Sequence, residues 1–344
     1  MKDKILFFSI DRLGDYLIRS NVIKKISENY KNSEIVVSDT NSKLISSQNF
    51  FSKIIEFDKK NKNKNKIKFI LTFFRKQYDS AICFDGKNIS NIIFFIIKAN
   101  FKHTFIYKKK GILNKIKFFL FVKILNIFNI SYTILYSRDL IEKDYFENYP
   151  SKYKLLKKYY QNITEDTYYL ENFEKTNKPK LNNYILIHLD EKFCDIEGIE
   201  KSFNNVLINL LKNTDKKIII TTYKNNFQYY KNLSINKIKY NNSQNLINKN
   251  EKIIIIEDLP LKEFYDLINN SLINISCHAG FFVHISLYNK KRTIDIINEY
   301  EEKWLNTWIT DTDRYKIVHK SNTKEKYSIE EIFKKITTQI NESH

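Results

Sequence analysis

The residues best suited to chemistry lie in one short stretch, which reads Cys-His-Ala-Gly-Phe-Phe-Val-His from position 277 to 284. The apolar run at residues 272–276 predicts a strand before it, and the spacing after it predicts a short helix. A glycine at such a junction lets the backbone approach a ligand, and the helix start offers unpaired N–H groups to an anion. We interpret this stretch as a phosphate-binding corner with His278 and His284 as donors. An ordinary strand-to-helix turn carrying two polar histidines is the alternative.

A second reactive stretch, Asp-Arg-Leu-Gly-Asp, follows the first apolar run of the chain at residues 4–10. Asp15 ends this stretch, and its carboxylate can accept a proton from a bound hydroxyl. Arg12 can bind a phosphate or carboxylate as a fork, and Gly14 permits a tight turn close to a ligand. In the alternative interpretation Asp15 caps the following helix, Asp11 is a turn residue and Arg12 forms a surface ion pair.

The sequence does not predict a metal site. Residues 311–313 read Asp-Thr-Asp, but they fall in a late polar stretch, and no cysteine–histidine spacing suggests zinc. The three cysteines, Cys83, Cys194 and Cys277, are far apart and odd in number. A disulfide framework is therefore not expected, and a reducing cytoplasm fits this cysteine usage.

Short apolar runs alternate with helical spacing in both halves of the chain, which predicts two α/β domains with parallel sheets. Strands are expected at residues 4–10, 34–38, 54–57, 80–84, 103–106, 184–189, 217–221, 252–256, 272–276 and 293–297. Helices are expected at residues 16–30, 67–76, 88–98, 112–130, 199–212, 225–233, 260–269 and 328–340. The lysine-rich residues 59–68 are expected to form a solvated loop.

We predict an N-terminal domain at residues 1–170, a linker at 171–182 and a second domain at 183–320. The remaining residues, 321–344, contain a terminal helix with Ser328 as N-cap and Glu331 three residues later, a capping box. We expect this helix to pack back on the N-terminal domain. The two doubly wound domains are expected to face a central cleft, which is the natural place for a ligand.

The formal charge of +19 indicates an anionic partner, although a composition rich in Lys, Asn and Ile accounts for part of it. Residues 112–130 form an apolar helix that contains three lysines and is a candidate for lying on a membrane surface. We expect instead that its apolar face packs against the core. The sequence contains neither a signal peptide pattern nor an apolar run long enough to span a membrane.

Two segments together resemble a known family. Residues 5–37, ILFFSIDRLGDYLIRSNVIKKISENYKNSEIVV, resemble the opening of family 9 glycosyltransferases, the lipopolysaccharide heptosyltransferases. Residues 253–296 resemble their donor domain, in which a strand–glycine–helix corner carries a following histidine. The family's corner usually reads D-[ST]-G-x-x-H, whereas here His278 replaces the acidic residue and His284 lies four positions after Gly280.

The resemblance implies a GT-B fold and an inverting, metal-independent transfer of heptose or a related sugar from a nucleotide-sugar, with no cofactor. Asp15 matches the aspartate that the family uses as general base, and Asp11, Arg12 and Gly14 fall in the acceptor segment. The donor candidates are His278, Ala279, Gly280, His284, Lys192, Thr221 and Thr222. The two threonines end a strand at the same sheet edge, where they contact the nucleotide or only cap. Lys192 is a weaker candidate, because a lone lysine in a charged loop is usually solvated.

The implied partners are a nucleotide-sugar, an anionic glycolipid or oligosaccharide acceptor such as lipopolysaccharide core or capsule, and an anionic membrane surface. This would place the protein in the cytoplasm, at the inner face of the membrane. Two alternatives stay open: an inactive GT-B relative that binds a glycan or a protein partner, and a GT-B nucleotide-sugar epimerase. Nucleic acid is not expected, because the lysines are scattered and no recognition motif is present.

Overall fold

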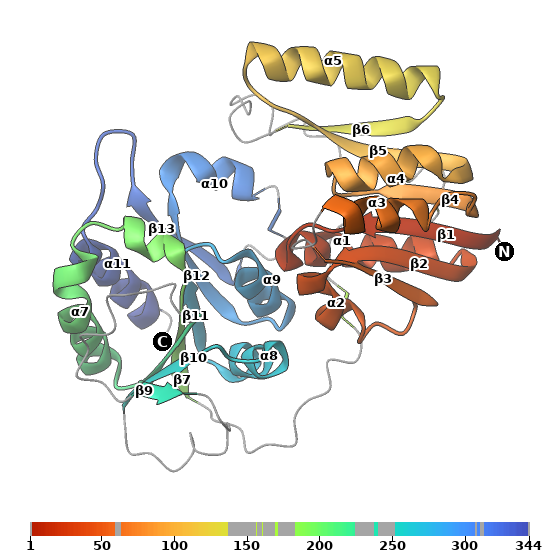
Figure 1. Ribbon diagram of the computed structural model, residues 1–344. Coiled ribbons are helices and arrows are strands. Elements are labelled where there is room, and N and C mark those ends of the chain that lie inside the picture. The colour runs from red at the N-terminus through yellow and green to blue at the C-terminus, as the bar shows by residue number, and fades with distance from the viewer. Residues whose placement is uncertain are drawn as a thin grey trace. The chain divides into compact units, whose positions relative to one another are not determined.

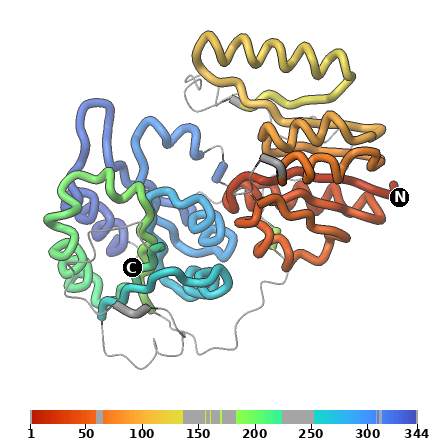
Figure 2. Tube along the Cα trace, in the orientation of Figure 1, coloured from red at the N-terminus to blue at the C-terminus, as the bar shows by residue number. Residues whose placement is uncertain are grey.

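A computed structural model describes residues 2–58, 63–136, 156, 160, 169–170, 183–223, 237–239, 252–306, 308–309 and 313–342 (Figures 1 and 2). The chain divides into two compact units, Met1–Phe173 and Glu174–His344, and each is an α/β structure. The predicted linker at 171–182, the predicted helix at 225–233 and the first two residues of Asp-Thr-Asp at 311–313 lie outside the described residues.

The first unit contains a parallel six-stranded sheet in the order β3-β2-β1-β4-β5-β6. Its strands are β1 (Lys2–Ser9), β2 (Tyr30–Ser38), β3 (Lys53–Phe57), β4 (Gln77–Cys83), β5 (Lys98–Lys108) and β6 (Ser131–Tyr136). Its helices are α1 (Leu13–Ser27), α2 (Asp39–Ile45), α3 (Asn63–Leu71), α4 (Asn88–Ile96) and α5 (Ile112–Ile127). The strand order reverses between β1 and β4, and ligands of doubly wound sheets bind at such a switch point, beyond the carboxyl ends of the strands.

The second unit contains a parallel seven-stranded sheet in the order β13-β12-β11-β7-β8-β10-β9. The strands are β7 (Tyr184–Leu189), β8 (Lys217–Thr222), β9 (Lys237–Lys239), β10 (Ile253–Glu257), β11 (Ile273–Ser276), β12 (Arg292–Asn298) and β13 (Tyr315–Ser321). A 3-10 helix, η3 (Glu191–Asp195), follows β7, and the α-helices are α7 (Ile199–Thr214), α8 (Leu261–Asn270), α9 (Gly280–Tyr288), α10 (Glu299–Asn306) and α11 (Ile329–Asn341). The switch point of this sheet lies between β11 and β7.

The apolar strand runs form the two cores. In β1 the four residues Ile5 to Phe8 are fully buried, as are Ile254 to Ile256 in β10. Strands covered on both faces read as continuous apolar runs, which explains why the sequence pattern located them. The doubly wound architecture predicted from the alternation is therefore confirmed in each unit.

Six elements were not predicted: α2, β6, η3, β9, α10 and β13. Helix α3 begins at Asn63, inside the stretch predicted as a solvated loop. The capping box of α11 is confirmed, because Ser328 Oγ accepts from Glu331 N at 3.3 Å and Glu331 Oε2 accepts from Ser328 N at 2.8 Å.

The terminal helix belongs to the second unit. Ile329, Ile332, Phe333 and Ile336 on α11 are buried in the same apolar cluster as Phe203 of α7. The prediction that this helix packs back on the N-terminal domain is wrong, because its apolar stripe is already covered by α7 and the second sheet.

Helix α5 also differs from its prediction. Leu125 is its one buried residue, and most of its other apolar side chains are exposed. The expectation that its apolar face packs against the core therefore holds only for the side that carries Phe118, Phe121, Val122 and Leu125. No helix among the described residues is both long and apolar enough to cross a membrane.

Candidate functional site

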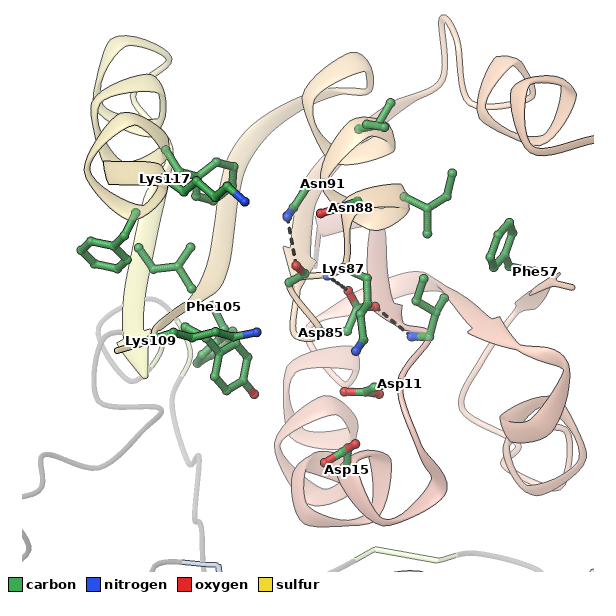
Figure 3. A pocket seen from close by; sticks show the side chains of 18 of the residues that line it. Asp11, Asp15, Phe57, Asp85, Lys87, Asn88, Asn91, Phe105, Lys109 and Lys117 are labelled. Atoms are coloured by element: carbon green, nitrogen blue, oxygen red, sulfur yellow. Dashed lines mark hydrogen bonds between the residues drawn. The ribbon is translucent and has the colours of Figure 1, made fainter. Parts of the chain in front are cut away.

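The first unit carries a groove of about 1430 Å³ at the carboxyl ends of β1, β4 and β5. Its lining includes the carboxylates Asp11, Asp15 and Asp85, and also Lys66, Lys87, Lys109 and Lys117 from the surrounding loops and helices. Figure 3 shows the three carboxylates beyond the ends of β1 and β4, with Lys109 and Lys117 projecting from the opposite wall. Apolar residues, among them Phe57, Phe105, Phe118 and Phe121, complete the walls. The groove therefore combines acidic, basic and apolar surfaces.

Asp15 is half-buried and lines the groove from the first turn of α1. Its Oδ2 accepts a hydrogen bond from the backbone N–H of Arg12 at 3.2 Å, so it also caps the helix. The two interpretations made from the sequence are compatible, because a carboxylate that accepts one N–H bond keeps further lone pairs for a ligand. Asp15 is thus positioned to accept a proton from a hydroxyl bound in the groove.

Asp11 has a different environment from Asp15. It is buried and forms an ion pair with the equally buried Arg19, with 2.5 Å between Arg19 Nη2 and Asp11 Oδ2. Burial raises the pKa of Asp11, against the opposing effect of Arg19. Its backbone carbonyl also accepts from Asn41 Nδ2 at 3.0 Å. Asp11 therefore connects α1 with the neighbouring helix α2 as well as lining the groove.

The other two acceptor candidates, Arg12 and Gly14, also differ in whether they are exposed to the groove. Arg12 is exposed and lines the groove, so its guanidinium is available to an anion. Gly14 is buried in the first turn of α1, outside the groove lining and outside the left-handed region of φ. Its predicted role in a tight turn is wrong, because the helix already begins at Leu13.

Sequence reasoning missed Asp85, which follows β4 at the switch point. Its carboxylate accepts from Ile10 N at 2.8 Å, Lys87 N at 2.8 Å and Ser90 Oγ at 2.9 Å, so it joins the ends of β1 and β4. Gly86 follows with a φ of +59°, and a Cβ there would lie 3.0 Å from the carbonyl oxygen of Phe105. The dipeptide Asp-Gly directly after a buried strand was the signal that could have identified this corner.

In the second unit, the corner between β11 and α9 lies at the switch point of the sheet. Ala279 is the N-cap of α9 and Gly280 its first residue, and positions 278–281 are half-exposed between buried neighbours. The N-terminus of α9 therefore opens to the surface at the place where parallel sheets bind ligands.

Lys192 lies at this corner. Its Nζ donates to the carbonyl oxygen of His278 at 2.6 Å, which places an ammonium group beside the start of α9. A second lysine, Lys320 of β13, donates to the carbonyl oxygen of Lys192 at 3.2 Å. Lys320 also pairs with Asp195 at 3.8 Å, so Lys192 and the N-terminus of α9 are the groups that favour an anion such as a diphosphate here.

His278 is held by a buried carboxylate that sequence reasoning missed. Asp295 of β12 accepts from the backbone N–H of His278 at 2.7 Å and from its Nδ1 at 2.6 Å. The hydroxyl of Tyr315 donates to the same carboxylate at 2.7 Å. These bonds hold His278 at a φ of +55°. An aspartate inside the apolar run Thr-Ile-Asp-Ile-Ile was the available signal, because a buried carboxylate must be paired.

The structure does not bring the other donor candidates to the same surface. His284 lies one turn into α9 and is 3% exposed. Thr221 and Thr222 are buried, and their hydroxyls bond to His188 Nδ1 at 3.1 Å and to the Leu189 carbonyl at 3.1 Å. These contacts favour the capping interpretation of the two threonines, because both hydroxyls join β8 to β7.

His188 lies behind the corner, buried between the rings of Phe264 and Phe282 at centroid distances of 4.8 and 5.5 Å. Burial lowers its pKa to about 4. Between pH 6.5, the ordinary histidine pKa, and about pH 4, His188 is therefore protonated in the unfolded chain and neutral in the folded protein. The contribution of the neutral His188 to the unfolding free energy is fully present above pH 6.5 and is lost as the pH falls towards 4.

We expect His188→Gln to remove this part of the pH dependence. The unfolding free energy of the wild type should fall by about 3 kcal/mol relative to the variant between pH 6.5 and 4. Urea denaturation at several pH values measures this difference. If the unfolding free energies of the two proteins change in parallel with pH, this pH dependence does not come from His188.

Among the residues that the structure describes, no group of three or more His, Cys, Asp or Glu side chains is arranged to hold a metal ion. The groove of the first unit instead combines carboxylates with lysines, and the corner of the second unit combines Lys192 with the buried Asp295.

Two doubly wound sheets of this kind, one in each half of a single chain, define the GT-B class of α/β proteins, and solved structures of that class match the chain over its length. Heptosyltransferase WaaC of E. coli with ADP-2-deoxy-2-fluoro heptose matches with a TM-score of 0.60 and 12% identity, covering 99% of this chain and 100% of that one. E. coli ADP-heptose lps heptosyltransferase II matches with a TM-score of 0.62 and 10% identity, covering 98% of both chains.

A putative UDP-N-acetylglucosamine 2-epimerase from Listeria monocytogenes also matches, with a TM-score of 0.58 and 10% identity, covering 100% of this chain and 89% of that one. No family model and no curated protein sequence matches the chain. At these identities the matches establish the fold: the chain has the GT-B architecture found in heptosyltransferases. The activity has to be argued from the site.

Proposed function

We propose that the protein is an inverting, metal-independent glycosyltransferase that transfers a heptose or related sugar from a nucleotide-sugar to an anionic acceptor. The observation that carries the proposal is the pairing of two sites in one GT-B chain. A half-buried carboxylate, Asp15, lies at the switch point of the first sheet, and a cationic helix N-terminus lies at the switch point of the second. Sugar transfer needs both a base for the acceptor hydroxyl and positive groups for the leaving diphosphate.

In this mechanism the second unit holds the donor. The N–H groups at the start of α9 and the ammonium of Lys192 receive the diphosphate, and they stabilise the negative charge that grows on it as the glycosidic bond breaks. Asp295 is a positioning residue, because it fixes His278 at the edge of this corner through two hydrogen bonds. The solved heptosyltransferase with bound ADP-2-deoxy-2-fluoro heptose supports a nucleotide-sugar as the donor.

The first unit binds the acceptor. Asp15 removes the proton from the attacking hydroxyl, and the ion pair of Asp11 with Arg19 holds the start of α1 in place. Arg12 and the groove lysines attract an acceptor that carries phosphate or carboxylate groups. The aromatic walls fit an acceptor that also has an apolar part, such as an anionic glycolipid of a surface glycan. Such an acceptor places the protein at the inner face of the cytoplasmic membrane.

A nucleotide-sugar epimerase is the second candidate, favoured by the match to the epimerase fold from Listeria. An epimerase acts on the nucleotide-sugar alone and has no need of an acceptor groove with a carboxylate at its base. The acidic, basic and apolar lining of the groove in the first unit therefore favours transfer. An inactive relative that binds a glycan or a partner would keep the groove and lose nucleotide binding.

Thermal unfolding with a panel of nucleoside diphosphates and nucleotide-sugars tests the proposal. A ligand present at about 100 times its dissociation constant adds about 2.7 kcal/mol of apparent stability. We expect one nucleotide to raise the unfolding midpoint of the wild type, with most of the shift lost in Lys192→Gln. The control is Lys252→Gln, which removes an exposed lysine of the same unit that pairs with Asp215 and should keep the full shift.

The outcomes distinguish the three candidate functions, which are sugar transfer, epimerisation and binding without activity. If no nucleotide raises the unfolding midpoint, the result would contradict the transferase and favour the inactive relative. A shift accompanied by conversion of the nucleotide-sugar to its epimer, without an acceptor, would favour the epimerase.

A further inference from the structure

Helix α5 exposes apolar side chains that soluble proteins usually bury. The exposed fractions are 77% for Ile112, 73% for Leu113, 67% for Phe119 and 66% for Ile127. Single exposed apolar residues need no explanation, but a contiguous set on one element marks an interaction surface. The helix lies beside β5 and β6 (Figure 1), and Phe121 on its inner side contacts Phe95 of α4 with the ring centroids 6.0 Å apart.

The exposed residues share one side of the helix. With about 3.6 residues per turn, this side carries Ile112, Leu113, Ile116, Phe119, Leu120, Ile124 and Ile127. We call it the α5 face. The opposite side carries Phe118, Phe121, Val122 and Leu125, which pack on the apolar cluster of the first unit. Both sides of α5 are therefore apolar, and among the described residues only the inner side packs against other elements.

The segment that contains α5 and its neighbouring strands carries charge of a single sign. Residues 86–136 contain nine lysines and neither an aspartate nor a glutamate. Three of these lysines lie on α5 and are exposed: Lys115 and Lys117 at the two borders of the face, and Lys123 within it. Three more, at positions 108–110, directly precede the helix. An occupant of this face must therefore offer an apolar interior and a negative surface.

An anionic lipid bilayer meets both conditions. A helix with an apolar side bordered by lysines lies in the plane of the interface, with its apolar residues among the acyl chains and its ammonium groups at the headgroups. Lysine within the apolar face is compatible with this arrangement, because its long side chain reaches the headgroups while its methylene groups remain in the apolar layer.

We propose that α5 is a membrane-docking helix that binds the surface of an anionic bilayer through the α5 face. The inner side of the same helix contributes Asn114, Lys117, Phe118 and Phe121 to the groove that contains Asp15. Docking through α5 therefore brings that groove to the lipid surface, where an amphiphilic ligand can enter it without leaving the interface. The inference does not depend on sugar transfer, because docking is measured without nucleotide or acceptor.

Vesicle flotation tests the proposal with the full chain. We expect the wild type to float with vesicles of phosphatidylcholine and phosphatidylglycerol in equal amounts, to bind vesicles of phosphatidylcholine alone far less, and to lose binding as salt is raised. The double variant Phe119→Ser/Leu120→Ser should bind the anionic vesicles at least about tenfold more weakly, because two large apolar side chains no longer enter the bilayer.

The matched control is Ile208→Ser/Tyr300→Ser, which removes two exposed apolar side chains, 43% and 66% exposed, from the second unit. It should bind anionic vesicles as the wild type does. Thermal midpoints of both variants should stay close to the wild-type value, since the replaced side chains are exposed. A change in binding can then be assigned to the surface.

Three results would overturn the proposal. The first is absence of wild-type binding to anionic vesicles at low salt. The second is equal binding by Phe119→Ser/Leu120→Ser and the wild type. The third is a dimer in sedimentation velocity that this double variant converts to a monomer, which would make a second copy of the chain the occupant of the α5 face.

Discussion

Replacing Asp15 with asparagine is expected to reduce sugar transfer by about 10²- to 10⁴-fold while leaving nucleotide binding unchanged. Asparagine has nearly the same shape but cannot take a proton from the acceptor hydroxyl. It keeps an oxygen that can accept from the N–H of Arg12, and asparagine and aspartate are similar N-terminal capping residues. Helix α1 should therefore remain folded. Initial rates with the donor identified by thermal unfolding measure the loss.

Glu331→Gln is the matched control for the loss of a capping carboxylate. Glu331 accepts from the N–H of Ser328 at 2.8 Å, as Asp15 accepts from that of Arg12, but it lies on α11 in the second unit. This variant should lower the thermal midpoint slightly and leave the rate of transfer unchanged. A rate for Asp15→Asn within tenfold of the wild-type rate would exclude Asp15 as the base.

Replacing Asp295 with alanine is expected to lower the unfolding free energy by about 3–5 kcal/mol. The substitution leaves three donors without their acceptor: the N–H and Nδ1 of His278 and the hydroxyl of Tyr315. It also releases His278 from its left-handed backbone conformation beside α9. We therefore expect nucleotide affinity to fall together with stability, as measured by urea denaturation and nucleotide titration.

Tyr315→Phe separates the contribution of the Tyr315 hydroxyl from that of the two bonds to His278. It removes one of the three donors and leaves the carboxylate bound to His278, so a cost of about 1 kcal/mol and unchanged nucleotide affinity are expected. Asp295→Asn keeps the size of the side chain, and it supplies a folded protein for titration if the alanine variant does not fold. Equal costs for Asp295→Ala and Tyr315→Phe would show that the bonds to His278 contribute nothing.

Much of the fold was predictable because it depends on short-range patterns. The buried strands are continuous apolar runs such as Ile-Leu-Phe-Phe at residues 5–8 of β1, and the helices between them have regular apolar spacing. Elements without such patterns were missed. Strand β13, for example, reads Tyr-Lys-Ile-Val-His-Lys-Ser and lies at the edge of its sheet, where polar residues are tolerated.

The candidate site was predictable where its residues lie in the loop after a strand or in the first turn of the next helix. Asp15 and Ala279–Gly280 were identified in this way, because residues beyond the carboxyl ends of parallel strands gather at one edge of the sheet. The partners of these residues come from distant parts of the chain. Asp295 is 17 positions from His278, and Lys192 is 86 positions away. Local spacing carries no information on such contacts.

The structure also distinguishes between residues that had the same predicted role. His278 and His284 looked equivalent as donors, yet one is half-exposed at the corner and the other is buried a turn further along α9. Helical periodicity determines on which side of a helix a residue lies, but the direction of the core is decided only when the helix packs.

By itself the sequence determined the alternation of strands and helices, the two domains, and the strand-end residues that define the two candidate sites. These features follow from period and order along the chain, which need no tertiary contact. Only the tertiary structure decided that α5 leaves an apolar side uncovered, that α11 completes the second core and that Asp295 holds His278. Each of these depends on which surfaces meet, and burial is a property of the packed molecule.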